Sequence, residues 1–254
     1  MSAAAGTLSG PLPRQRLLTV FAWGVHLYTG LGAAAGLLAL YYASIADFRA
    51  SFIAMGVATF IDSSDGPLAR WVNVKHRVPS FDGALLDNII DYLTYTVAPV
   101  FLMLEAGIIP TTHLGLLLAC FVMLASVYGF CQTDAKTADH YFLGFPNYWN
   151  LVAFYLYCID GPTIFNWSVL TLLAVMVFVP IRYIYPNRTI PLRPLTLTLG
   201  IIWAIITIVM LFMLPTVNRF LLAASLSFIA YYFLASFALH AHAFRVSRRM
   251  SDAA

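Results

Sequence analysis

Asp62-Ser-Ser-Asp65-Gly66-Pro-Leu-Ala69-Arg70, followed after twelve residues by Gly83-Ala-Leu-Leu-Asp87-Asn-Ile-Ile-Asp91, is the most acidic stretch of this chain. The whole sequence has 11 carboxylates, and this window of 30 residues holds five of them, Asp82 included. Residues three or four apart share one face of a helix, so Asp62 and Asp65 lie on one face, and so do Asp87 and Asp91. The polar and turn-forming residues between the pairs are expected to reverse the chain, which makes four carboxylates converge.

Four converging carboxylates predict a divalent-metal site. Left unpaired in a membrane, each carboxylate would cost about 2.5–3.5 kcal/mol on insertion scales, and bound cations remove that cost. Oxygen ligands without Cys or His at a matching position suit Mg²⁺, Mn²⁺ or Ca²⁺ better than zinc or copper. Two such ions about 3.5–4 Å apart form a clamp for displacement at phosphorus. The alternative is a set of aspartates that cap helix ends at the membrane surface.

The composition is that of a membrane protein. Hydrophobic residues make up 61% of the 254 residues and charged residues 10%, against about 25% charged in soluble proteins. We therefore expect an all-α integral membrane protein that forms one domain over residues 1–254. The three cysteines lie singly and predict neither a disulfide framework nor a metal site, and nothing in the sequence suggests nucleic-acid binding.

Apolar runs that approach the ~20 residues of a spanning helix predict about eight transmembrane helices, near residues 17–44, 52–71, 84–104, 114–131, 146–159, 164–181, 195–214 and 220–243. With the N-terminus in the cytoplasm, all but Arg49 and Arg219 of the 14 Lys and Arg residues fall on the inner side. The positive-inside rule then places both termini and the acidic window in the cytoplasm. Residues 1–13 are expected to be disordered, and residues 245–254 to form a basic tail at the inner surface.

The order Asp-x2-Asp-Gly-x2-Ala-Arg, a gap, and Gly-x3-Asp-x3-Asp resembles the signature of the CDP-alcohol phosphotransferases, integral membrane enzymes of phospholipid synthesis. The family usually has eight residues in the gap, and this chain has twelve, Trp71 to Asp82. A longer turn absorbs the difference, because closure entropy grows slowly with loop length. The resemblance implies that Asp62, Asp65 and Asp87 bind Mn²⁺ or Mg²⁺, two ions in all. It also implies that Asp91 shares in this binding and acts as the general base.

The resemblance further implies a place for the nucleotide. Gly66, Ala69 and Gly83 are small where the family packs the cytidine against backbone, and Arg70 is expected to pair with a phosphate or with an aspartate. For the glycines alone, the alternative is close helix packing, which is common in membranes.

A second segment, residues 131–150, is polar and aromatic and is expected to be a cytoplasmic loop that binds substrate. Its sequence from Lys136 to Pro146 resembles the Lys-Thr-x-Asp-x-x-Phe-x-Gly-x-Pro segment of the phosphatidylcholine synthase and phosphatidylserine synthase branches. The Leu-Gly-Phe-Pro-x-Tyr-Trp-Asn version, residues 143–150, is most similar to the bacterial phosphatidylcholine synthase branch. Lys136 is a second candidate for binding a phosphate.

The resemblance implies transfer of the phosphatidyl group of CDP-diacylglycerol to choline, with release of CMP. Aromatic faces usually hold a quaternary ammonium, and the candidates are Tyr92, Tyr95, Tyr148 and Trp149, each of which has a structural role as its alternative. Serine or another alcohol remains open as the acceptor. Outside enzymes, a divalent-metal transporter remains an alternative, for which charges spread over several helices are expected. The resemblance also implies a homodimer, and we expect it in a bacterial inner membrane with the active site facing the cytoplasm.

Overall fold

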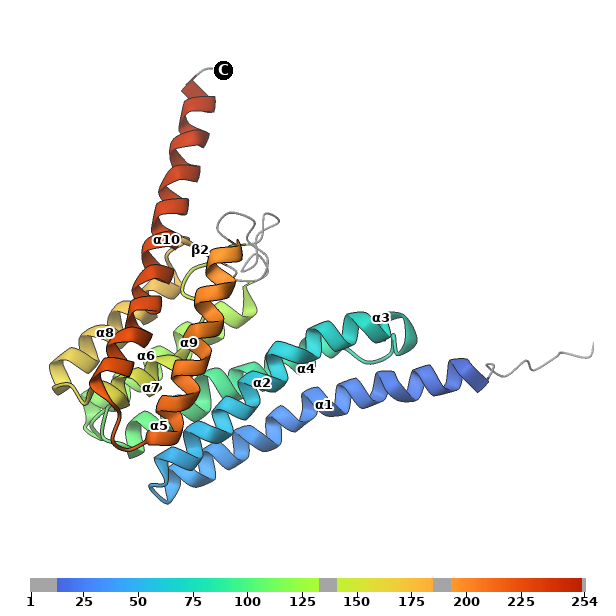
Figure 1. The fold of residues 1–254 in the computed structure, drawn as a ribbon, viewed down its shortest axis with the longest axis horizontal. Coiled ribbons are helices and arrows are strands. Elements are labelled where there is room, and N and C mark those ends of the chain that lie inside the picture. Colours follow the sequence, from blue (N-terminus) through green and yellow to red (C-terminus); the bar gives the residue numbers. More distant parts are fainter. Residues whose placement is uncertain (1–12, 133–140, 185–192, 253–254) are drawn as a thin grey trace, which may run out of the picture.

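The computed structural model describes residues 13–132, 141–184 and 193–252, and most of them are helical (Figure 1). In chain order the elements are α1 (Pro13–Ser44), α2 (Phe48–Val72), α3 (Val74–Arg77), α4 (Gly83–Asp91), the π-helix η1 (Tyr92–Val97), α5 (Ala98–Glu105), α6 (His113–Cys131), β1 (Tyr141–Leu143), α7 (Trp149–Ile159), α8 (Thr163–Val177), β2 (Arg182–Ile184), α9 (Arg193–Met213) and α10 (Arg219–Asp252). The backbone stays helical from α4 through η1 into α5, because Tyr92 and Ala98 both have right-handed helical dihedral angles.

Four of the described helices are long and apolar enough to cross a membrane: Gln15–Ser44, His113–Cys131, Arg193–Met213 and Arg219–Ala241. Helices α7 and α8 are apolar but shorter. The acidic helix α2 and the composite helix α4–η1–α5 are not among the four. The prediction of an all-α integral membrane protein is confirmed, whereas the number of eight spans and the orientation of the termini stay predictions.

Helix α1 lies along α2 for much of its length (Figure 1) and also packs closely on α4 and η1. A Cβ atom added to Gly32 would come within 2.7 Å of the Ile90 side chain, and one added to Gly36 within 2.8 Å of the Leu93 side chain. Small residues four apart allow such close approach of membrane helices. The packing sets the polar residues of α1 beside the acidic window.

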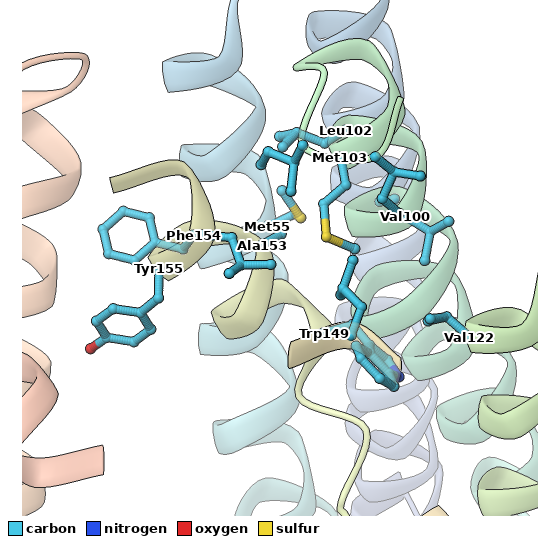
Figure 2. Packing of buried hydrophobic residues seen from close by; sticks show 14 of the residues in the cluster. Met55, Val100, Leu102, Met103, Val122, Trp149, Ala153, Phe154 and Tyr155 are labelled. Atoms are coloured by element: carbon cyan, nitrogen blue, oxygen red, sulfur yellow. The ribbon is translucent and has the colours of Figure 1, made fainter. Parts of the chain in front are cut away.

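The main hydrophobic core joins α5, α6 and α7 to the first half of α2 (Figure 2). Met55 of α2, Met103 of α5 and Val122 of α6 all belong to this core. Trp149 is 0% exposed in this core, and its indole N–H donates to the Ser126 hydroxyl at 2.7 Å. The core therefore fixes the first half of α2 and leaves its second half, with the aspartates, for a polar site.

A small two-stranded sheet was not predicted. Strand β1 pairs antiparallel with β2, with Tyr141 opposite Ile184. Ile184 is held to α10, since its carbonyl accepts from the Tyr232 phenol at 3.2 Å and its N–H donates to the Ser236 hydroxyl at 3.1 Å. Strands of three residues are too short to show a period in the sequence. Through this sheet, the end of the 131–150 segment is tied to the chain that follows α8.

Candidate active site

The two halves of the acidic window meet in the folded chain. Asp62 of α2 and Asp87 and Asp91 of α4 each offer a carboxylate oxygen, and these three atoms lie within 4.8 Å of one another. All three side chains are half-buried. The predicted convergence of the window is thus present for three of its four paired aspartates.

The turn between α2 and α4 has clear local causes. Asn73 ends α2 in the left-handed conformation, with φ 58°, and its N–H donates to the carbonyls of Ala69 and Arg70. Asp82 then begins α4, because its Oδ1 accepts from the N–H groups of Ala84 at 3.1 Å and Leu85 at 3.0 Å. Such a cap satisfies N–H groups that the first turn of a helix leaves without partners. The fifth aspartate of the window is therefore a helix cap, and the short helix α3 fills part of the twelve-residue gap.

Asp65 lies beside the three clustered aspartates with a partner of its own. It is 7% exposed, and its Oδ2 accepts a hydrogen bond from Thr29 Oγ1 of α1 at 2.8 Å. A buried carboxylate needs such a partner, because burial of an unpaired charge is costly.

All four aspartates line one narrow pocket, together with Thr29, Gly32, Ala58, Ile61, Ile90 and Thr94. Its volume is about 10 Å³, close to the room that a single water molecule needs. A pocket of this size suits a small ion and is far too small for a nucleotide. A larger substrate has to bind over its mouth.

The residues of the pocket fit a divalent cation by their chemistry. The donor atoms of the cluster are carboxylate oxygens alone, which are the ligands that Mg²⁺, Mn²⁺ and Ca²⁺ prefer. A cation would also relieve the repulsion among three carboxylates held within 4.8 Å. The identity and number of ions, and the role of Asp65 as a ligand, stay predictions.

The four residues assigned to the nucleotide lie on the same two helices as the aspartates: Gly66, Ala69 and Arg70 on α2, and Gly83 at the start of α4. A Cβ added to Gly83 would come within 2.8 Å of the His26 ring, and one added to Gly66 would lie 3.3 Å from the Arg70 guanidinium. Close packing of α1 on α4 is thus sufficient to explain Gly83. Ala69 is half-buried and Arg70 is exposed, and contact of these residues with a nucleotide stays a prediction.

The aromatic candidates for choline have different surroundings. Tyr148 is half-buried, and its ring centre lies 6.4 Å from that of Tyr95. The Tyr95 phenol donates to Asp62 Oδ2 at 2.7 Å. The Tyr92 phenol lies 4.0 Å from the sulfur of Met123 on α6. Since Trp149 is enclosed in the core, Tyr148 is the candidate whose ring lies near the acidic site and is also accessible in part; Lys136 lies outside the described residues.

Two polar neighbours of the site were not recognised from the sequence as such. Thr94 lines the pocket, and Tyr95 bonds to an aspartate although its sequence position suggested only an aromatic candidate. The signal for Tyr95 is its spacing, because Asp87, Asp91 and Tyr95 follow one another at intervals of four residues. Residues at that spacing lie along one face of a helix.

Comparison with known proteins identifies the family of this chain. The model of the CDP-alcohol phosphatidyltransferase family matches residues 19–184. The chain is 38% identical over 223 residues to the phosphatidylcholine synthase of Legionella pneumophila subsp. pneumophila, covering 85% of this chain and 87% of that protein. It is 40% identical over 190 residues to the phosphatidylcholine synthase of Legionella bozemanae, with coverage of 72% and 87%. The corresponding protein of Mesorhizobium japonicum is 36% identical over 204 residues, with coverage of 79% and 76%. The chain belongs to the CDP-alcohol phosphatidyltransferase family.

Proposed function

We propose that this enzyme transfers the phosphatidyl group of CDP-diacylglycerol to choline, which gives phosphatidylcholine and CMP. The observation that carries the chemistry is the convergence of Asp62, Asp87 and Asp91 from two helices. The choice of choline is supported by relatives named phosphatidylcholine synthase that match most of the chain. The described cluster lies on only two elements, whereas a transporter is expected to spread its charges over several helices.

Asp62, Asp65, Asp87 and Asp91 would hold the divalent cations, two ions of Mn²⁺ or Mg²⁺. When bound, the ions neutralise the pyrophosphate and stabilise the charge of the leaving CMP. The residues of the chain fix where this happens. The Thr29 hydroxyl of α1 fixes Asp65 on α2, and the Asp82 cap fixes the start of α4, which carries Asp87 and Asp91. Fixed ligands would hold the reacting phosphorus in one position.

Asp91 would act as the general base. The choline oxygen forms a bond to the phosphorus that carries the diacylglycerol, and its proton passes to the Asp91 carboxylate. The bond from this phosphorus to the bridging oxygen breaks, and CMP leaves with that oxygen and its electron pair. Because a carboxylate is a weak base for an alcohol, the proton is transferred late, when the attacking oxygen has become acidic.

The substrates would bind over the mouth of the pocket. Gly66, Ala69 and Gly83 leave room for the cytidine, and Arg70 and Lys136 would bind phosphate oxygens. The ring of Tyr148 would contact the quaternary ammonium of choline, since aromatic faces attract such cations. Trp149 would support Tyr148 from the core rather than touch choline.

The membrane arrangement completes the proposal. The shorter helices α7 and α8, the acidic helix α2 and the composite helix α4–η1–α5 would add to the four apolar helices to give eight spans, with both termini in the cytoplasm. The site would then face the cytoplasmic side of a bacterial inner membrane, and the enzyme would work as a homodimer. Residues 131–150 would form the substrate loop and residues 245–254 the basic tail, within one domain of residues 1–254.

The test uses purified protein in detergent with CDP-diacylglycerol and Mn²⁺ or Mg²⁺, with labelled choline, serine, inositol and glycerol 3-phosphate offered in parallel. We expect CMP release and lipid labelling with choline alone, both removed by EDTA and restored by added Mn²⁺. Labelling with another alcohol would overturn the choice of choline and keep the transferase. No turnover with any acceptor would overturn the transferase itself.

A further inference from the structure

The Tyr95 side chain is oriented toward the acidic cluster rather than toward a substrate. It is 8% exposed, and its phenol donates to Asp62 Oδ2 at 2.7 Å. A phenol that donates to a carboxylate makes a charge-assisted hydrogen bond, which is shorter and stronger than a neutral one. The bond occupies one oxygen of Asp62 and leaves the other oxygen and further lone pairs for a cation.

The backbone at Tyr95 has an uncommon conformation. Tyr95 lies in the π-helix η1, which directly follows Asp91. A π-helix is rare, occurs mostly as a single turn inside an α-helix, and is frequent at functional sites. Here it follows the helix that carries two of the clustered aspartates, and its third and fourth residues, Thr94 and Tyr95, both face the site.

Two further polar residues fix the turn of α2 that precedes Asp62. Thr59 lies three residues before Asp62 on α2, so the two side chains share one face of the helix. Thr59 accepts from Asn150 Nδ2 of α7 at 3.0 Å and donates to the carbonyl of Met55 at 3.0 Å. Asn150 is itself 7% exposed. A hydrogen bond between α7 and α2 therefore holds α2 about one turn before Asp62, and the Tyr95 phenol holds Asp62 itself.

We propose that Tyr95 is a positioning residue for the metal site, which holds the Asp62 carboxylate in its binding orientation with the support of Thr59 and Asn150. The inference rests on the proposed metal-dependent transfer. Groups that hydrogen-bond to metal ligands fix their orientation, and their loss typically weakens metal affinity or activity about 10- to 100-fold. Tyr95 therefore tunes metal affinity, and its burial excludes it from the choline candidates.

The test measures Mn²⁺ binding in the absence of substrate, by the loss of the free-ion signal in electron paramagnetic resonance. Tyr95→Phe removes only the phenolic oxygen, and we expect its affinity for Mn²⁺ to be at least about tenfold weaker than that of the wild type. Turnover of this variant should be reduced at low Mn²⁺ concentration, because less metal is bound, and should recover at high Mn²⁺ concentration. A residue that serves only the fold would not show recovery by excess metal.

The matched control is Tyr155→Phe, which removes a phenol that is just as buried but lies in contact with Ser225 and Trp203. Its Mn²⁺ affinity should equal that of the wild type. Affinity of Tyr95→Phe within twofold of the wild type would overturn the inference and leave the proposed function intact. A wild type that binds no Mn²⁺ would overturn both. If Tyr95→Phe is not recovered folded, Thr59→Val replaces it: several-fold weaker binding is expected, and unchanged binding overturns the inference.

Discussion

Two buried tyrosines lie in two regions of this enzyme that differ in charge: one region is acidic and the other is neutral. At the acidic site, formed by α1, α2, α4 and η1, the Tyr95 phenol donates a hydrogen bond to the Asp62 carboxylate. At the junction of α7, α9 and α10, the Tyr155 phenol bonds to the Ser225 hydroxyl and accepts from the Trp203 indole N–H at 2.7 Å. The two phenols are buried to nearly the same extent. A buried hydrogen bond therefore does not by itself mark function; the charge of its partner does.

The two regions also differ in what their polar groups do for stability. At the junction, the hydroxyls of Thr207 and Ser225 add a further neutral hydrogen bond at 3.3 Å. Each polar group named there has a hydrogen-bond partner. At the acidic site, three carboxylates are held within 4.8 Å of one another, and like charges at that distance repel. Function is thus expected to cost stability at the acidic site, and polar groups at the junction should serve stability alone.

Asp91→Asn is the variant with the largest expected effect, and it tests whether the acidic site serves function at a cost in stability. The change removes the proposed base, so turnover should fall by about 10²–10⁴-fold, the range that general base catalysis contributes. Thermal stability without metal should be equal or higher, because one of the mutually repelling charges is lost. CMP release and the midpoint of thermal unfolding measure the two effects.

Asp82→Asn is the control for Asp91→Asn, since it changes the same residue type within the same window. Asn is as good a helix cap as Asp, so turnover should stay near the wild-type value. Equal losses in the two variants would mean that the window acts through its overall charge and that Asp91 has no special role.

Thr29→Val tests the acidic site from α1. The variant removes the hydrogen bond from Thr29 Oγ1 to Asp65, and hydrogen bonds to charged groups contribute about 1.5–3 kcal/mol. Turnover should fall by about tenfold as Asp65 loses its position. The control is Thr96→Val on η1, because the Thr96 hydroxyl is buried and has no hydrogen-bond partner among the described residues. If both variants lose the same activity, crowding rather than the Asp65 bond is responsible.

Tyr148→Leu should have a smaller effect, confined to choline. Contact of an aromatic face with a cation contributes about 1 kcal/mol, so the KM for choline should rise by about fivefold. The KM for CDP-diacylglycerol should not change, and Tyr148→Phe should restore the KM for choline because it keeps the ring. A rise in both KM values would instead mean that Tyr148 supports the binding of both substrates.

The sequence was sufficient for the acidic site in outline. Four aspartates at helical spacing, in a chain with few charges, predicted that the acidic residues converge, and three of them do so in the structure; the bound cation stays a prediction. The membrane class followed from composition, and α1 and α6 follow their apolar runs closely. These features are local, so spacing along the chain determines them.

What the sequence could not supply depends on contacts between distant segments. Asp82 was counted in the acidic window without a role of its own, and only its hydrogen bonds at the start of α4 show that it is a helix cap. Trp149 looked like an accessible aromatic, but the indole N–H is held by Ser126 from another helix. The spacing of Tyr95 from Asp87 and Asp91 places it on their face of the helix, but its hydrogen bond to Asp62 joins two distant segments, which no pattern in a single sequence predicts.

The smallest effect on turnover is expected for Tyr155→Phe, which tests the neutral side of the comparison. The variant leaves the Trp203 N–H without its phenol acceptor, and the loss of a neutral hydrogen bond costs about 1 kcal/mol. The midpoint of thermal unfolding should therefore fall by a few degrees, while turnover with choline and Mn²⁺ affinity stay within twofold of the wild type. Loss of turnover without loss of stability would place the junction in the catalytic cycle. The charge of a phenol's partner would then no longer separate the two regions, because a neutral network would be acting on the chemistry from a distance.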